Sequence, residues 1–106
     1  VGDYSWIGED VWIDNLSNVK IGDNVCISQG VYFCTGNHNF KKKSFDLICK
    51  PIIIDSESWI GSKVIIGPGN KIGRGSVIKM GSIITKDIPP QSIFTQSQTI
   101  KNYFQR

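Results

Sequence analysis

Isoleucine recurs at every sixth position through the second half of the chain, at Ile54, Ile60, Ile66, Ile72, Ile78 and Ile84. A strand repeats every two residues and a helix about every 3.6, so neither element explains this spacing. The period instead predicts an internal repeat in which each hexad forms one short strand and one turn. Three hexads, about 18 residues, would close a triangular coil, and successive coils would stack at the usual strand spacing of about 4.8 Å.

The other positions of the hexad agree with this geometry. Glycine often follows the isoleucine, as it does at Gly8, Gly22, Gly61, Gly67 and Gly73. Glycine suits a corner where a side chain would crowd the next coil or where φ must be unusual. The fifth position is mostly small or β-branched, with Ser58, Val64, Ser76 and Ser82, and with Asn70 as the exception. Stacking at this period predicts three pairs: Ile54 over Ile72, Ile60 over Ile78, and Ile66 over Ile84.

The first half of the chain follows the same repeat with one slip. The six-residue spacing holds through Ile7, Ile13 and Val19, then moves by two residues and resumes at Ile21. The slip, at residues 15–20, predicts a bulged corner.

One long segment leaves the repeat. Between Phe33 and Ile52 the sequence reads CTGNHNFKKKSFDLICKP, without hexad register. Such an insertion is tolerated when it projects from one face of a solenoid, and projecting loops often carry the functional site. This loop, about residues 34–51, holds the chain's only histidine, His38. Histidine exchanges a proton near neutral pH and suits a general base; a solvent-exposed loop histidine without a role is the alternative.

Length and composition indicate one small domain. The 106 residues carry a formal net charge of +3, which allows an anionic ligand but does not by itself indicate nucleic acid. No apolar run approaches the roughly 18 residues of a membrane span. The three cysteines, Cys26, Cys34 and Cys49, are odd in number and lack the spacing of metal ligands. They favour a reducing cytoplasm over a disulfide framework.

Several segments together resemble the hexapeptide-repeat acyltransferases. They are WIDNLSNVKIGDNVCISQG, CTGNHNF, SFDLI, WIGSKVIIGPGNKIG and GSIITKDIPP. The hexads alone would indicate only the superfamily, whereas residues 35–38 followed by residues 45–48 are far more specific. Within the family, the chain most resembles the O-acetyltransferases of colanic acid and other exopolysaccharides. Galactoside and maltose acetyltransferases are close cousins.

This resemblance implies an all-β fold, a left-handed parallel β-helix, which is an exception to the usual right-handed crossover. It implies a homotrimer with acetyl-CoA in a groove between neighbouring subunits. The family's catalytic histidine falls on His38, which would take a proton from a sugar hydroxyl so that the oxygen attacks the thioester. Asn15, in the bulged corner, matches an asparagine that relatives place near the active site. A turn asparagine with positive φ is the alternative for Asn15.

The resemblance also implies which residues line the acetyl-CoA groove: Trp59, Ser62, Gly81, Ser82, Thr85 and Lys86. Small residues and backbone amides let the thin pantetheine arm approach the strands, and a lysine can meet a phosphate. The alternative is that Gly81 and Ser82 are only coil corners and that Lys86 is a solvated charge. The lysines at 41–43 could contact CoA phosphates or an anionic glycan, or form a solvated loop.

Three positions depart from the family pattern. Met80 stands where relatives carry a small residue beside the cofactor, and Asn39 stands where they commonly carry aspartate after the histidine. Residues 95–99 read TQSQT in place of a turn near the far end of the cofactor.

The expected organisation is a β-helical domain over residues 1–94 and a tail over residues 95–106. The tail has apolar residues at Ile100, Tyr103 and Phe104, a spacing that predicts one short amphipathic helix on the last coil. Because the chain begins inside the repeat, we expect an N-terminal region to precede it.

The predicted function is transfer of an acetyl group from acetyl-CoA to a hydroxyl of a sugar or exopolysaccharide precursor. No metal, nucleic-acid partner or membrane insertion is expected. A γ-class carbonic anhydrase needs several histidines for zinc, and one cannot hold it. Two alternatives stay open. One is a catalytically silent domain that trimerises or binds a partner, and the other is an acetyltransferase for serine, an aminosugar or an antibiotic.

Overall fold

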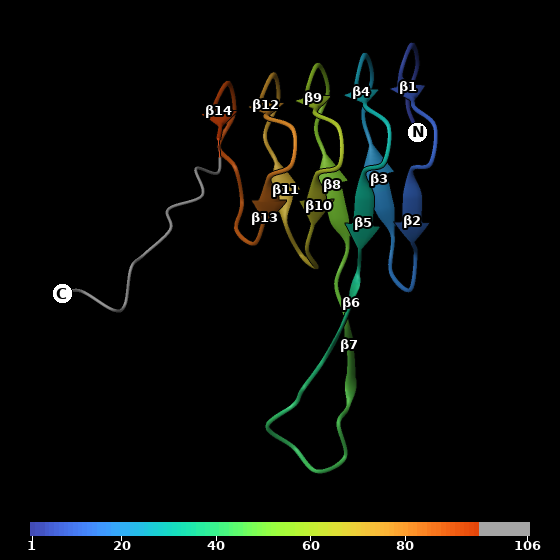
Figure 1. The fold of residues 1–106 in the computed structure, drawn as a ribbon, viewed down its shortest axis with the longest axis vertical. Helices are drawn as coiled ribbons and strands as arrows, with labels where there is room; N and C mark the ends of the chain where they lie inside the picture. The colour runs from blue at the N-terminus through green and yellow to red at the C-terminus, as the bar shows by residue number, and fades with distance from the viewer. Residues whose placement is uncertain (96–106) are drawn as a thin grey trace, which may run out of the picture.

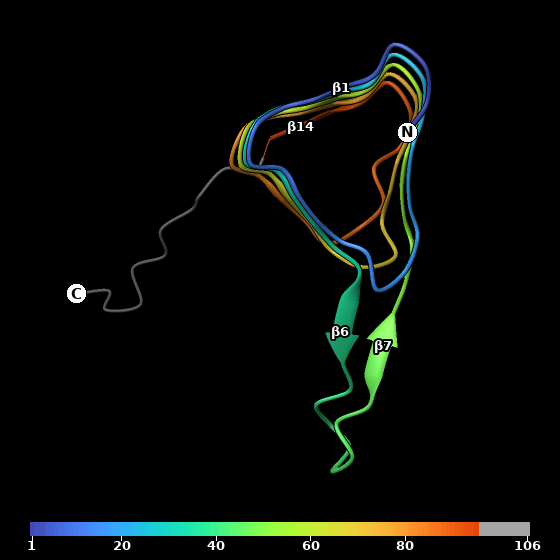
Figure 2. The ribbon, with the colours of Figure 1, turned by 90° about the vertical axis from the view of Figure 1, so that its right-hand side faces the viewer.

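Short strands wind into a stack of triangular coils in the structure, a computed structural model that describes residues 1–95. Strands that are far apart in the sequence lie side by side as the coils stack (Figure 1). Viewed along the stack, the coils overlie one another as a triangle (Figure 2). The all-β prediction is confirmed for residues 1–95, where every regular element is a strand.

Three parallel sheets form the faces of this prism. The first face has the order β1-β4-β9-β12-β14, comprising Trp6–Ile7, Cys26–Ile27, Trp59–Ile60, Val77–Ile78 and Ile93–Phe94. The second face has the order β13-β10-β5-β2, comprising Ile83–Ile84, Ile65–Ile66, Tyr32–Cys34 and Trp12–Asp14. The third face has the order β11-β8-β3, comprising Lys71–Ile72, Ile52–Ile54 and Val19–Ile21.

The strand register confirms the predicted isoleucine stacking. The pairs are Ile54 with Ile72, Ile60 with Ile78, and Ile66 with Ile84. All six side chains are at most 1% exposed, so they form the core of the prism. Side chains alternate along a strand, and the residue before each isoleucine therefore points outward. The isoleucine and the buried fifth-position residue of each hexad, such as Val64 or Ser58, together fill the narrow triangular interior.

Positive φ angles mark the fourth position of the hexad, with values of 57 to 77° at Glu57, Lys63, Gly69, Gly75 and Gly81. The left-handed conformation turns the chain at each corner. The glycine directly after the isoleucine has a different cause. A Cβ atom on Gly61 would lie 2.6 Å from the backbone nitrogen of Met80 in the next coil. Crowding by the next coil, and not an unusual φ, accounts for this glycine.

Polar residues at the buried fifth position bond to a neighbouring coil. The Oγ of Ser58 donates to the carbonyl of Gly73 at 3.0 Å, and the Oγ of Ser76 donates to the carbonyl of Pro89 at 2.9 Å. Asn70, only 7% exposed, donates to two backbone carbonyls at 3.0 and 3.2 Å. Since an unpaired buried polar group is costly, these bonds make serine and asparagine acceptable inside the coil.

The corner between the second and third faces varies in length, and we call it the variable corner. The six-residue spacing is longer by two residues between Ile13 and Ile21, which confirms the predicted bulge. It is shorter by two residues between Ile84 and Ile88, which bridges to β11. The insertion at residues 34–51 leaves from the same corner (Figure 2). All three irregularities therefore gather along one edge of the prism.

No helix within residues 1–95 has the length and apolar character needed to cross a membrane. The short C-terminal helix predicted for the tail lies outside the described residues.

Candidate active site

A two-stranded antiparallel hairpin carries His38 away from the prism. Its strands are β6 (Gly36–His38) and β7 (Leu47–Cys49), and His38 pairs with Leu47. Figures 1 and 2 show the hairpin leaving the variable corner and extending away from the coils. Residues 39–46 join the two strands, and we call them the hairpin loop. The protruding loop predicted from the sequence is thus confirmed.

Hydrogen bonds give the hairpin loop a defined backbone. The amide of Asn39 donates to the carbonyl of Asp46 at 2.9 Å and closes the loop. The amide of Phe45 donates to the carbonyl of Lys42 at 3.0 Å. The side-chain oxygen of Asn39 accepts from the amide of Lys41 at 3.2 Å. Asn39, one of the departures from the family pattern, therefore shapes the loop through its amide group.

His38 is held by Phe45 through two contacts. The Nδ1 atom of His38 lies 3.0 Å from the backbone carbonyl oxygen of Phe45. The two rings stack, with centroids 4.3 Å apart and an angle of 14° between their planes. Phe45 has a φ of 52°, and it is the one non-glycine residue with positive φ outside the hexad corners of residues 1–95. Backbone strain in a bulky residue is often found at functional sites.

The contact to Phe45 determines how His38 can react. A carbonyl oxygen only accepts hydrogen bonds, so Nδ1 carries the hydrogen in this contact. In the neutral imidazole the unprotonated nitrogen is then Nε2, which can accept a proton from a bound molecule. The side chain is exposed, so a ligand can reach it. The arrangement suits a general base held in one tautomer.

Thr35 ties the root of the hairpin to the bulged corner. Its side chain is fully buried, its Oγ1 donates to the carbonyl of Asp14 at 2.5 Å, and it accepts from the amide of Ser17 at 3.1 Å. Asn15 lies between these two residues and is exposed. Its φ is not among the positive values, so the left-handed turn alternative does not apply to Asn15. The structure places Asn15 at the foot of the hairpin, although it makes no hydrogen bond with His38 within the described residues.

Tyr32 and Cys34 lie two residues apart on β5, near the same root. Electrostatic repulsion from the thiolate form of Cys34 raises the pKa of the Tyr32 hydroxyl, and burial, the hydrogen bond to Cys34 and the charge of Asp14 act in the same direction. Tyr32 therefore stays neutral at physiological pH and offers a hydroxyl group to its surroundings.

Two of the predicted cofactor residues line one groove on the first face, beside β9 and β12. The groove has a volume of about 260 Å³, and Trp59 and Ser62 lie in its wall with Met80. The indole nitrogen of Trp59 donates to the Oγ of Ser28 at 3.0 Å, which fixes the ring. Met80 belongs to the same wall and is 75% exposed, so its side chain is open to a ligand in the groove.

The remaining predicted cofactor residues occupy different places. Gly81 is joined to the groove because its amide donates to the carbonyl of Ser62 at 2.9 Å. Ser82 is only 1% exposed at the buried fifth position, so the structure places it inside the coil and not in the wall of the groove. Thr85 and Lys86 are exposed at the variable corner, two coils from the hairpin. Within one chain, the predicted set is therefore divided between two edges of the prism.

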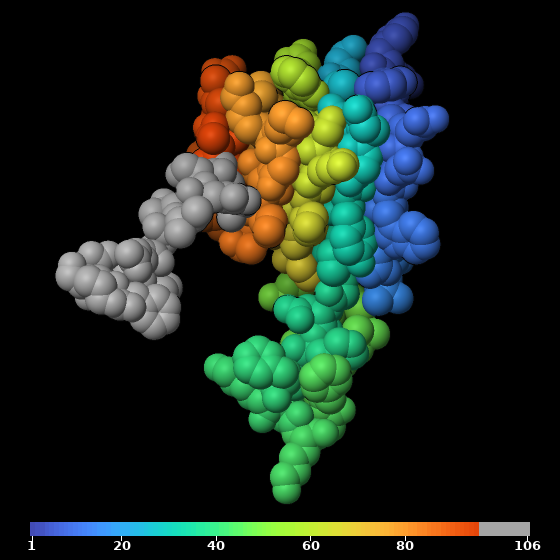
Figure 3. Space-filling view, viewed as in Figure 1, coloured from blue at the N-terminus to red at the C-terminus, as the bar shows by residue number. Residues whose placement is uncertain are grey.

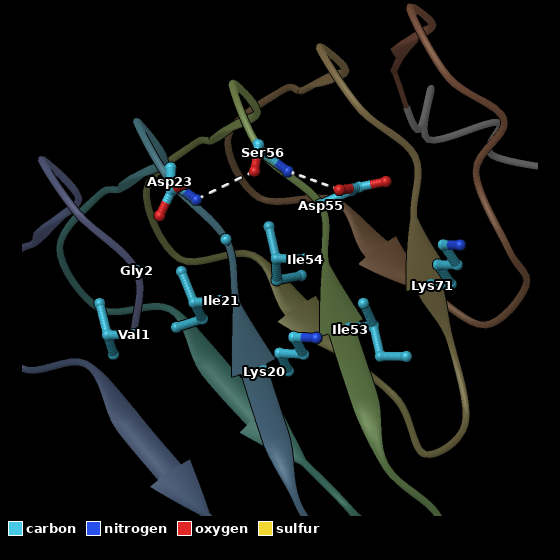
Figure 4. A pocket seen from close by; sticks show the side chains of 11 residues that line it. Val1, Gly2, Lys20, Ile21, Asp23, Ile53, Ile54, Asp55, Ser56 and Lys71 are labelled. Atoms are coloured by element: carbon cyan, nitrogen blue, oxygen red, sulfur yellow. Dashed lines mark hydrogen bonds between the residues drawn. The ribbon is translucent and has the colours of Figure 1, made fainter.

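A larger cavity, about 570 Å³, lies over the third face, and none of the predicted site residues lines it. Figure 4 shows Lys20 and Lys71 on either side of Ile53 in this cavity. The polar groups at one end of the cavity bond to one another. The amide of Asp23 donates to the Oγ of Ser56 at 3.0 Å, and the amide of Ser56 donates to the Oδ1 of Asp55 at 2.8 Å. These groups serve coil stacking.

Sequence reasoning missed Phe45 and Thr35. Both lie inside the segments that carried the family resemblance, but their roles arise from a backbone carbonyl and a buried hydroxyl. A positive φ at a phenylalanine has no signal in the sequence. Only the three-dimensional contact identifies it.

Comparison with known proteins agrees with this geometry. The fold matches a hexapeptide-repeat-containing acetyltransferase from Vibrio cholerae, solved in complex with acetyl coenzyme A, with a TM-score of 0.82 and 34% sequence identity. That match covers 87% of this chain and 52% of the other. No protein-family model matches the chain.

Two Escherichia coli K12 proteins are similar in sequence. WcaF, named as a colanic acid biosynthesis acetyltransferase, is 37% identical over 89 residues, which are 84% of this chain and 49% of WcaF. Galactoside O-acetyltransferase is 47% identical over 78 residues, which are 71% of this chain and 38% of that protein. The chain thus spans about half the length, or less, of these curated relatives.

The structural match confirms the left-handed parallel β-helix that the sequence predicted. The six-residue ladder, the hairpin at one corner and these relatives lead to one conclusion: the chain belongs to the hexapeptide-repeat acetyltransferases.

Proposed function

We propose that this chain moves an acetyl group from acetyl-CoA to a hydroxyl group of a sugar or glycan, with His38 as the general base. The observation that carries the proposal is the contact between Nδ1 of His38 and the Phe45 carbonyl, because it leaves Nε2 free to accept a proton. The relatives support the chemistry, since one is solved with acetyl coenzyme A and another is named a galactoside O-acetyltransferase.

The proposed reaction is a direct transfer. Nε2 of His38 takes the proton of the acceptor hydroxyl as its oxygen attacks the thioester carbonyl. The tetrahedral intermediate collapses with cleavage of the carbon–sulfur bond. The imidazolium returns its proton to the departing thiolate, so the products are the acetyl ester and free CoA. Asn15, at the foot of the hairpin, is proposed to position the acceptor or the oxyanion.

The groove on the first face is proposed to hold the pantetheine arm of acetyl-CoA. Its wall combines the apolar surfaces of Trp59 and Met80 with Ser62, and Gly81 adjoins it through the bond from its amide to the Ser62 carbonyl. A narrow wall of small residues suits a thin, mostly apolar chain. Thr85 and Lys86, at the variable corner, are proposed to meet the nucleotide end, where an ammonium can pair with phosphate.

We propose that a complete site forms between copies of the chain, as a homotrimer. His38 and the groove lie at different edges of the same prism, with the second face between them. The outer sides of the first and second faces carry large exposed apolar residues. On the first face Trp59 is 53% exposed and Ile93 71%, and on the second face Trp12 is 68% exposed. Apolar surface of this kind marks a protein interface. Packing it against another copy would bring the hairpin of one chain to the groove of its neighbour.

A thiol-release assay tests the catalytic proposal. The chain is incubated with acetyl-CoA and a panel of sugars and glycans, and we expect acceptor-dependent release of free thiol. His38→Ala should slow release by at least about 100-fold, the low end for losing a general base. His38 lies outside the core, so the variant should fold. Lys63→Gln, a surface change on a coil, is the control.

Equal thiol release by the wild type and by His38→Ala across the panel would refute the role of His38.

Binding of CoA separates an enzyme from a silent trimerisation domain. CoA at about 100 times its dissociation constant should stabilise the folded state by about 2.7 kcal/mol. The absence of a thermal shift at millimolar CoA would favour the silent domain, and Met80→Ala should strengthen binding if Met80 narrows the groove.

A further inference from the structure

The whole formal net charge of the chain resides in the hairpin that carries His38. Residues 34–51 contain four lysines and one aspartate, a net charge of +3. The rest of the sequence contains eight basic and eight acidic side chains and is neutral. The hairpin is therefore the cationic pole of the chain, and the proposed base lies within it.

Three of the four lysines stand together on the hairpin loop. Lys41, Lys42 and Lys43 are all exposed. Lys42 lies 3.7 Å from a carboxylate oxygen of Asp46, with side chains 63% and 53% exposed, and such an open pair is weak. Lys41 and Lys43 make no salt bridge with another described residue. Figure 3 shows the hairpin extending beyond the stacked coils.

The hairpin loop is an ordered surface and not a string of solvated charges. Its backbone is closed by the bond from Asn39 to Asp46 and by the turn between Lys42 and Phe45. Phe40, beside the lysines, is 77% exposed, and Phe45 is 52% exposed while its ring stacks on His38. Exposed aromatic surface beside exposed cations indicates a ligand that offers both an apolar face and negative charge. A sugar ring that bears a carboxylate or phosphate has this chemistry.

We infer that the acceptor is an anionic glycan and that the lysines at 41–43 hold its negative groups while a neighbouring hydroxyl meets His38. This inference rests on the proposed acetyl transfer. A base must touch the acceptor hydroxyl, and the lysines lie on the same hairpin loop as Phe45, whose carbonyl contacts Nδ1 of His38, so an acceptor bound at His38 lies beside this loop. Lysine ammonium groups attract carboxylates and phosphates as point charges and raise their local concentration. Neutral glycans of the same size are correspondingly poorer acceptors.

Binding is measured first, independently of turnover. The probes are fluorescent hexagalacturonate and, as the neutral match, fluorescent maltohexaose. Saturating CoA is present so that the cofactor site is filled and the anionic probe cannot bind there. Fluorescence anisotropy should show that the wild type prefers hexagalacturonate. The triple variant K41Q/K42Q/K43Q should bind it at least about 10-fold more weakly. Salt at about 200 mM should weaken the wild type more than this variant, because exposed charges are screened.

The matched control is K20Q/K63Q/K71Q, which removes the same charge from the coils. Its affinity for hexagalacturonate should stay within about twofold of wild type. In the thiol-release assay, the loop variant should lose at least about 10-fold in kcat/KM for anionic acceptors and keep its value for neutral ones.

Four results would count against the inference. Equal losses in both triple variants would show that only overall charge matters. A loss confined to the KM for acetyl-CoA would assign the lysines to the cofactor. Loop-dependent binding to anionic phospholipid vesicles without loop-dependent glycan binding would assign them to a membrane surface. Turnover of neutral and anionic acceptors at equal kcat/KM would leave acetyl transfer standing and remove the anionic acceptor. Loop-dependent hexagalacturonate binding without turnover of any acceptor would instead support the anion site and refute the proposed transfer.

Discussion

The backbone carbonyl of Phe45 lies 3.0 Å from Nδ1 of His38, and the Phe45 ring stacks on the imidazole at a centroid distance of 4.3 Å. One residue thus supplies both a hydrogen-bond acceptor and an aromatic face. Phe45 does so at a φ of 52°, a conformation that bulky residues rarely adopt. The closure of the hairpin loop on His38 determines which ring nitrogen faces a ligand.

The tautomer of His38 should be observable directly. In the neutral protein, the nitrogen chemical shifts should show a protonated Nδ1 and an unprotonated Nε2, since the Phe45 carbonyl can only accept. Nitrogen-15 NMR measures both shifts, and the assignment is unambiguous because His38 is the chain's only histidine. A spectrum dominated by protonated Nε2 would contradict the geometry.

Loss of the Phe45 ring should reduce turnover without removing the backbone contact. Stacked aromatic pairs contribute about 0.5–1.5 kcal/mol, so Phe45→Ala should lower kcat by roughly 2- to 12-fold. Phe45→Tyr keeps a ring of the same shape and should retain most activity. The same NMR experiment on Phe45→Ala should show a smaller preference for protonated Nδ1. Unchanged kcat and tautomer in Phe45→Ala would mean that the ring has no positioning role.

The hydroxyl group of Thr35 should stabilise the junction between the hairpin and the bulged corner. Thr35→Val leaves the Ser17 amide and the Asp14 carbonyl without their partner, which should cost about 1–3 kcal/mol in the free energy of unfolding. Thr35→Ser keeps the hydroxyl and should lose less. Urea denaturation of the two variants gives this difference. If valine and serine are equally tolerated, water or a shifted backbone must satisfy both groups.

Adjacent isoleucines on β10 should differ sharply in their contribution to stability. Ile66 is fully buried, so Ile66→Ala should cost about 2–5 kcal/mol in the free energy of unfolding. Ile65, one residue earlier, is 39% exposed on the outer side, and Ile65→Ala should cost less because part of its surface already meets water. Thermal unfolding of both variants checks this, and similar losses would mean that the outer side is buried in an assembly.

The assembly itself can be tested on the second face. Trp12 is 68% exposed there, and Trp12→Glu should convert the proposed trimer into smaller species by placing a charge in the interface. Ile53→Glu, on the outer side of the third face, is the matched control and should leave the trimer intact. Analytical ultracentrifugation distinguishes the species. A wild type that sediments as a monomer at micromolar concentration would refute the trimer.

Much of the fold could be predicted from the sequence because the hexad is a local period with one consequence. Ile54, Ile60 and Ile66 each occupy the inward position of a short strand, so the register of one coil over the next follows from their spacing. The slip near Asn15 and the insertion around His38 were visible as breaks in that period. Both predictions about shape are confirmed.

The candidate site could be predicted only in part. His38 stood out as a lone histidine in the single long break, but its partner Phe45 could not be identified. Trp59 and Ser62 line one groove, whereas Lys86 lies at another edge of the same prism, and the binding of acetyl-CoA by these residues stays a prediction. The spacing of these residues along the chain does not reveal which corner each one occupies across several coils.

The sequence by itself determined the triangular stack, because a six-residue period leaves one apolar side chain per strand to bury and sets the stacking register. Only the tertiary structure brought the Phe45 carbonyl to Nδ1 of His38 and divided the residues proposed to bind the cofactor between two edges of the prism. Those features depend on the hairpin, where no period constrains the backbone and the contact between residues 38 and 45 results from how the loop closes. The spacing of the hexads sets the geometry of the coils, whereas the geometry of the insertion at residues 34–51 depends on the contacts that its residues make.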